Sequence, residues 1–190
     1  MAKICVRFGK ARVDDRDDAL RLLHQPWEGP ESYAFWVFPP AKKRDFKTYQ
    51  KLHQIKIPEI YREFLLLSNG FQAFDLDLFG MSYGMLKDPP LLDRSGFQCL
   101  DLSTANRTEK HSYEVDPEWL MFGGRCYSDN ENCGYFLSET GAISSYLEGG
   151  KKVQQWRSFE RFLASEIAAA EKFARMEYPE EWNQVDKDMI

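Results

Sequence analysis

The sequence lacks the residue patterns on which most catalytic, cofactor and metal sites depend. It has only three histidines, and none stands in a His-x-x-x-His or His-Glu pairing. It contains no Gly-x-Ser-x-Gly elbow, no Walker loop and no dinucleotide-binding glycine pattern. Gly123-Gly124 lacks the lysine and the Ser or Thr of a phosphate cradle, which favours a turn between strands. We therefore predict a protein that is not an enzyme and needs no cofactor.

Cysteines are few and scattered along the chain, at positions 5, 99, 126 and 133. Only Cys126 and Cys133 lie near each other, and their separation is not the Cys-x-x-Cys spacing with which two thiolates share a zinc ion. We interpret the cysteines as free, mostly buried thiols, with a disulfide or a metal pair as the alternative.

Long apolar runs are also absent. The longest, Tyr33 to Phe38, is far too short to cross a bilayer. The basic residues of the first twelve positions are not followed by an apolar segment, so no secretory signal is expected. With 43% hydrophobic and 15% aromatic residues, the chain is rich enough to fold around a core. We expect a cytoplasmic protein that does not bind membranes.

Charge is distributed unevenly along the chain. Residues 1–62 contain 13 Lys and Arg against 8 Asp and Glu, whereas residues 63–190 contain 12 against 22. The basic excess is concentrated between Lys42 and Lys56. A chain dominated by carboxylates repels the phosphate backbone, so direct nucleic-acid binding is not expected. A negative face instead favours a basic protein partner.

Residues 57–70 predict a helix with both ends marked. Pro58 suits its first turn, apolar residues recur at helical spacing, and Asn69-Gly70 tolerates the positive φ that ends a helix. The pattern then changes to the alternation of a half-buried strand over 74–79.

Further elements follow from the same kinds of pattern. Helices are predicted over 17–24, 45–54 and 103–110, and another begins after Ser158. Strands are predicted over 3–8, 33–38, 120–122, 134–137 and 142–147. Segregated helices and consecutive strands indicate an α+β fold, with a mixed or antiparallel sheet and helices packed against it.

Several of these segments resemble the SUKH superfamily, the Smi/Knr type of domain. The 57–70 helix is similar to its hallmark Ile-Pro to Asn-Gly segment, and the run from Pro117 to Gly124 to its second signature. Gly134-Tyr135-Phe136-Leu137 with Gly141-Ala142-Ile143 resembles its late hairpin, and Ser158 to Leu163 the opening of its last helix. The expected organisation is a SUKH-like domain over 45–175. Residues 1–44 form a strand-helix-strand elaboration packed on it, and 176–190 an acidic tail.

The resemblance implies a non-enzymatic immunity protein that binds and occludes a bacterial toxin, often a nuclease. The cognate toxin is then expected to be basic. The alternatives are a regulatory or scaffolding module with several partners and, less favoured, a small hydrolase or metal-dependent enzyme. The sequence leaves the oligomeric state open.

The candidate partner-binding residues are carboxylates and one tryptophan. Asp75 and Asp77 would share one strand face, interpreted as a polar outer surface in preference to a metal or acid/base pair. The 129–132 segment has some character of a calcium loop without its full pattern, and a loop before a hairpin is favoured. Trp27 lies among breaker residues and is an interface anchor or packs onto the domain. The full set is Asp75, Asp77, Asp129, Glu131, Glu139, Glu148 and Trp27.

Overall fold

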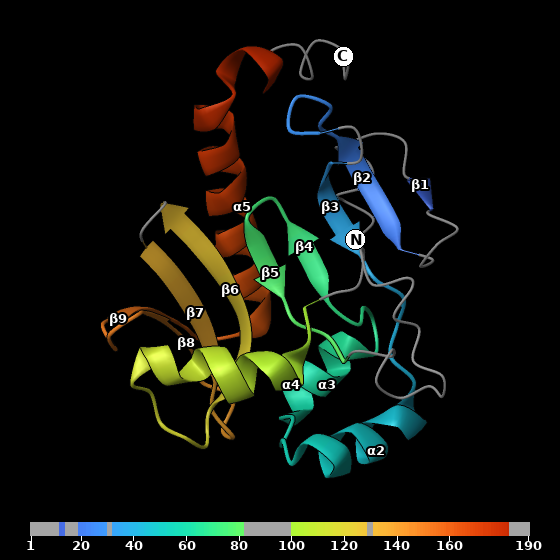
Figure 1. The fold of residues 1–190 in the computed structure, drawn as a ribbon, viewed down its shortest axis with the longest axis vertical. Helices are drawn as coiled ribbons and strands as arrows, with labels where there is room; N and C mark the ends of the chain where they lie inside the picture. Colours follow the sequence, from blue (N-terminus) through green and yellow to red (C-terminus); the bar gives the residue numbers. More distant parts are fainter. Residues whose placement is uncertain (1–11, 14–18, 30–31, 82–99, 129–130, 183–190) are drawn as a thin grey trace.

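Nine antiparallel strands form a single sheet in which each strand pairs with the next along the chain (Figure 1). The computed structural model describes residues 12–13, 19–29, 32–81, 100–128 and 131–182. The strands are β1 (Arg12–Val13), β2 (Leu20–His24), β3 (Tyr33–Val37), β4 (Phe71–Ala73), β5 (Leu76–Leu78), β6 (Leu120–Ser128), β7 (Glu131–Leu137), β8 (Ile143–Leu147) and β9 (Lys152–Trp156). The predicted α+β fold with an antiparallel sheet is confirmed.

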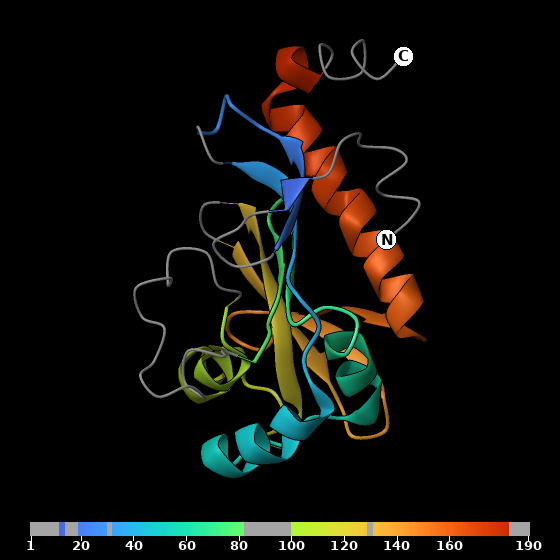
Figure 2. The same cartoon turned by 90° about the vertical axis from the view of Figure 1, so that its right-hand side faces the viewer.

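Helices cover both faces of this sheet. The long helix α5 (Phe159–Glu177) lies on one face, and α4 (Leu102–Thr104) with the short turns η3 (Ala105–Glu109) and η4 (Lys110–Tyr113) lies on the other (Figure 2). Two more helices, α2 (Lys43–His53) and α3 (Glu59–Leu65), lie at one end of the sheet. None of the helices in the described ranges combines the length and apolarity needed to cross a bilayer.

The hallmark helix is confirmed as α3, with Pro58 as its N-terminal cap residue and Gly70 at a φ of 101° after its end. Tyr61 and Leu65 are fully buried, and the Tyr61 hydroxyl lies 2.9 Å from the Phe122 carbonyl oxygen. Asn69 also binds the backbone of Met81 through its side chain. Its side chain donates to the Met81 carbonyl and accepts from the Met81 N–H, at 2.6 and 2.7 Å. These two bonds satisfy a buried stretch of backbone as a neighbouring strand would.

Several elements differ from their sequence-based predictions. Gly123-Gly124, expected to be a turn between strands, lies within β6. Residues 20–24, expected to be part of a helix, form β2, because pairing with β3 outweighs their weak local preference. Of the strand expected over 74–79, only Leu76–Leu78 (β5) forms, because Phe74-Asp75 is a two-residue turn between β4 and β5. Phe74 has a φ of 56°, which is unusual for a bulky residue. Its ring packs edge-on against Phe35, and this burial compensates for the strain.

The predicted helix caps and the strands at the two ends of the sheet have different outcomes. Ser158 caps α5 as expected, accepting from the Arg161 N–H, whereas the cap of α4 is Asp101 and not Ser103. The predicted strand over 3–8 lies outside the described residues. No local pattern predicted β9, whose side chains are mostly exposed and show no apolar alternation.

Tyr49 joins α2 to α4 through a buried hydroxyl. It donates to Asp101 Oδ1 at 2.6 Å and accepts from the Ser103 N–H at 2.8 Å. Burial and the neighbouring Asp101 carboxylate raise the pKa of Tyr49 well above its usual value. The hydroxyl therefore stays protonated and keeps both bonds across the physiological range.

We expect Tyr49→Phe to lower the free energy of unfolding by about 1–3 kcal/mol, because it leaves the Ser103 N–H and one Asp101 oxygen without their partner. Urea denaturation measures the change. Tyr146→Phe is the matched control, since the Tyr146 hydroxyl has no recorded hydrogen bond among the described residues. Equal stability of the two variants would contradict the assigned role of Tyr49.

Candidate partner-binding surface

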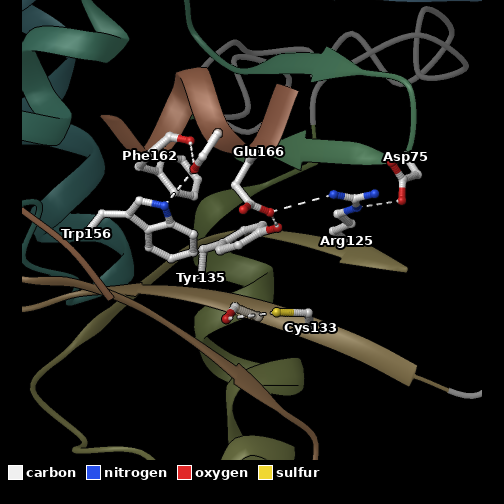
Figure 3. Close-up of polar contacts among 9 residues, drawn as sticks. Asp75, Arg125, Cys133, Tyr135, Trp156, Phe162 and Glu166 are labelled. Atoms are coloured by element: carbon white, nitrogen blue, oxygen red, sulfur yellow. Dashed lines mark hydrogen bonds and ion pairs between the residues drawn. The ribbon is translucent and has the colours of Figure 1, made fainter. Parts of the chain in front are cut away.

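The predicted site residues do not form one surface. Asp75 lies in the β4–β5 turn and forms an ion pair with Arg125, with Oδ2 2.8 Å from the guanidinium Nε. The side chain of Arg125 is almost completely buried, and its Nη1 lies 3.7 Å from Oε2 of the buried Glu166 on α5. Tyr135 donates its hydroxyl to the same Glu166 oxygen (Figure 3). Asp75 is therefore engaged within the molecule.

Asp77 is the middle residue of β5, where it pairs with Gln72 on one side and Gly124 on the other. Adjacent strand residues point to opposite faces, so Asp77 lies on the face opposite Leu76 and its pair Arg125. Asp77 is half-buried, and this burial, with a smaller effect of Asp75, raises its pKa to about 7. Near neutral pH, Asp77 thus carries much less charge than an exposed aspartate.

Glu139 and Trp27 have intramolecular partners. Glu139, in the β7–β8 turn, forms an ion pair with Lys56, and both side chains are more than half exposed. Exposed pairs of this kind contribute little to stability, so Glu139 can exchange partners at small cost. Trp27 is half-buried, and its ring meets that of Trp182 edge-on at 6.2 Å. This arrangement matches the packing alternative for Trp27.

Glu131 and Glu148 do lie together, at the end of the sheet formed by the β6–β7 and β8–β9 connections. Asn132, next to Glu131, donates its side-chain amide to Glu148 Oε1 at 3.0 Å, and the Glu148 N–H donates to the Asn132 carbonyl. Both glutamates are exposed. Asp129, two residues before Glu131, lies outside the described residues.

Two further glutamates join them from the η3–η4 segment. The β8–β9 turn packs against this segment, with the Gly149 N–H donating to the Ser112 carbonyl and Gly150 lying against the Glu114 side chain. Tyr113 is buried close to Glu148 and Glu109. Its pKa is raised first by burial and then by these two carboxylates, among other groups. We define the carboxylate patch as Glu109, Glu114, Glu131 and Glu148.

The carboxylate patch is electrostatically uncompensated within the described part of the chain. All four side chains are exposed, and none forms an ion pair with another described residue. No local sequence pattern would have added Glu109 and Glu114, since they reach the patch through the packing of η3 and η4 against the β8–β9 turn. The surface can attract and orient a cationic partner.

Chemistry of other kinds has less support at this surface. Cys126 and Cys133 are both thiols outside any disulfide, and the burial expected of them is found for Cys133 but not for the exposed Cys126. Across the described ranges, no group of three or more His, Cys, Asp and Glu side chains is arranged to hold a metal ion.

The model of the SMI1 / KNR4 family (SUKH-1) matches residues 40–165. This region begins just before α2 and ends within α5, so it contains β4 to β9 and the carboxylate patch. A search of the curated proteins found no match.

Proposed function

Because this chain belongs to the SMI1 / KNR4 family (SUKH-1), we propose that it is an immunity protein that binds and occludes a bacterial toxin. The family match, which covers well over half of the chain, is the observation that carries the proposal. This family is associated with protein–protein interaction in toxin immunity and is generally non-catalytic. The proposed activity is therefore binding alone.

The carboxylate patch supports a basic toxin domain as the partner. Four exposed carboxylates at one end of a rigid sheet create a local negative potential that speeds association with a cationic surface. A toxin that acts on nucleic acid carries such a surface, because it must bind phosphates. Occupation of that surface by the patch would exclude the toxin's substrate. Asp129 belongs to the proposed contact on sequence grounds.

The test begins with the product of the neighbouring gene, co-expressed and purified as a complex. We expect the double variant Glu131→Lys/Glu148→Lys to slow association at least tenfold at low salt, and the difference to shrink as salt rises. Surface plasmon resonance measures both rates. The control is Glu63→Lys/Glu180→Lys, which makes the same charge change at exposed residues of α3 and the C-terminal turn.

Three outcomes separate the possibilities. Slower association of the patch variant alone supports the proposal and its contact surface. Equal slowing of both double variants would assign the attraction to net charge and remove the patch from the proposal. Failure of the protein to bind the toxin or to rescue cells from it would reject the immunity function.

A further inference from the structure

Strand β9 ends the sheet with an open edge. It pairs with β8 from Ile143↔Trp156 to Tyr146↔Lys152, and no described strand lies on its other side (Figure 1). An edge strand of this length presents a row of backbone N–H and C=O groups that can pair with another chain. The opposite edge of the sheet differs, because β1 is only two residues long.

The side chains of β9 are uncovered on both faces of the strand. Four of its five residues are exposed, including Val153 with 46% of its surface accessible. Only Trp156 is buried, and it donates its indole N–H to Ser165 on α5 at 2.6 Å. Trp156 therefore fixes one end of the strand, while the remaining residues lack the covering layer that usually accompanies a strand.

A hollow lies at the fixed end of β9. It has a volume of about 590 Å³ and is lined by Thr140, Gly141, Ala142, Gln155, Trp156 and Arg157. The first three of these residues come from the β7–β8 turn, so the hollow opens where β9 meets that turn. It combines an aromatic ring with a cation and several polar groups, a lining suited to a polar or charged side chain.

The strand and its flanks are cationic. Residues 151–157 contain Lys151, Lys152 and Arg157 and no carboxylate. Lys152 donates to Gln155 at 2.9 Å, and no ion pair is recorded for these cations within the described ranges. The carboxylate nearest in sequence to the hollow, Glu139, is paired with Lys56. An acidic ligand on this edge would therefore meet one cation at each end of the strand, Lys152 and Arg157.

We propose that the outer edge of β9 binds an extended, acidic segment of another protein by strand addition, with one of its side chains in the hollow. Backbone pairing supplies affinity in such complexes, and pockets for alternate side chains supply specificity. The register shift between β8 and β9 at Ser145/Tyr146 places Lys152 on the same face of the sheet as Gln155, two residues before Arg157. Carboxylates on that one face of the added strand would therefore face Lys152 at one end and Arg157 at the other. The inference stands on the β9 edge alone and does not depend on the function proposed above.

Two other occupants fit this edge less well. Antiparallel pairing of β9 with a second copy, in the register that pairs all five residues, sets Lys151 of one copy opposite Arg157 of the other. Like charges directly opposite each other destabilise a sheet. A nucleic acid would gain from the cations, but it cannot complete the backbone pairing or cover the exposed Val153.

The probe is a synthetic peptide in which Asp and Val alternate, compared with its Lys/Val counterpart and a proline-containing isomer of the acidic sequence. We expect only the alternating acidic peptide to bind, and to slow amide hydrogen exchange at least tenfold within residues 152–156. No binding, or protection confined to another region such as α2, would overturn the proposal. Tight binding of a single-stranded oligonucleotide in place of the peptide would also overturn it.

Variants of the full chain separate backbone pairing from charge. Because N–H groups alternate in direction along a strand, either Gln154→Pro or Gln155→Pro removes an outward donor and leaves β8 pairing intact. Of the two proline variants, the one that loses the outward N–H is recognised by its unchanged thermal stability. That variant should bind the acidic peptide at least tenfold more weakly than the wild-type protein. Lys152→Glu/Arg157→Glu should also weaken binding at least tenfold, while the control Lys43→Glu/Lys47→Glu on α2 changes it less than twofold. Equal effects of the two charge variants would refute the site.

Discussion

Arg125→Met should lower the free energy of unfolding by about 3–5 kcal/mol, the range found when one partner of a buried ion pair is removed. Arg125 lies between the Asp75 and Glu166 carboxylates, and its side chain is only 3% exposed. Burial already raises the pKa of both carboxyl groups, and the guanidinium opposes that rise. Methionine fills a similar volume but leaves the buried Glu166 and the half-buried Asp75 carboxyl groups without their cation. Chemical denaturation at pH 7 measures the loss.

The pH dependence of this loss provides an internal control. Without Arg125, the folded-state pKa values of Asp75 and Glu166 rise further above those of the unfolded chain. Between the unfolded and folded pKa values, the folded state binds more protons, so stability falls as pH rises. The deficit of Arg125→Met should thus be larger at pH 8 than at pH 5. Adding Glu166→Gln should recover part of it, and a pH-independent deficit below 1 kcal/mol would contradict the assigned role.

Asp77→Asn should stabilise the protein at pH 8 by up to about 4 kcal/mol, following the pKa difference between folded and unfolded states. Burial raises the pKa of Asp77 from 3.8 to about 7, and the nearby Asp75 contributes in the same direction. The folded state therefore holds a proton that the unfolded chain has released between these two values. The wild-type protein loses stability over this interval as pH rises, and asparagine, which does not ionise, avoids the loss.

Urea denaturation of both proteins at pH 4 and pH 8 tests this expectation. The stability difference should be small at pH 4, where Asp77 is protonated in the folded protein, and large at pH 8. Glu63→Gln serves as the control, because Glu63 is exposed on α3 and its neutralisation should change stability little. A difference that does not vary with pH would show that Asp77 is ionised in the folded protein as it is in the unfolded chain.

Local sequence patterns predicted the elements whose residues carry their own start, period and end. Pro58 and Asn69-Gly70 delimited α3, and Ser158 opened α5. Apolar segments bounded by turn residues likewise indicated parts of β3, β6, β7 and β8. Prediction failed where the local pattern was weak or where a distant contact competed with it. The Phe74-Asp75 turn has no Asn-Gly or Asp-Gly signal, and β2 takes its conformation from β3.

The surroundings of the candidate partner-binding residues were likewise predictable from the sequence only in part. Acidic residues 131 and 148 lie together because β7 and β8 pair, and the sequence already predicted a hairpin there. The Asp-x-Asp spacing of Asp75 and Asp77 is that of two carboxylates on the solvent face of a strand. Asp75 is instead ion-paired with Arg125, and Asp77 is half-buried. Glu109 and Glu114 enter the carboxylate patch from a segment that lies far from Glu148 in sequence.

The sequence by itself determined the α+β class, the hallmark helix and the family of this protein, because these depend on short-range spacing of apolar, capping and turn residues. Only the tertiary structure decided which carboxylates are exposed to a partner, that Arg125 pairs with Asp75 and Glu166, and that β9 has an open edge. The reason is physical. Burial and charge pairing are set by residues brought together from distant positions, and no local pattern records which of them will meet.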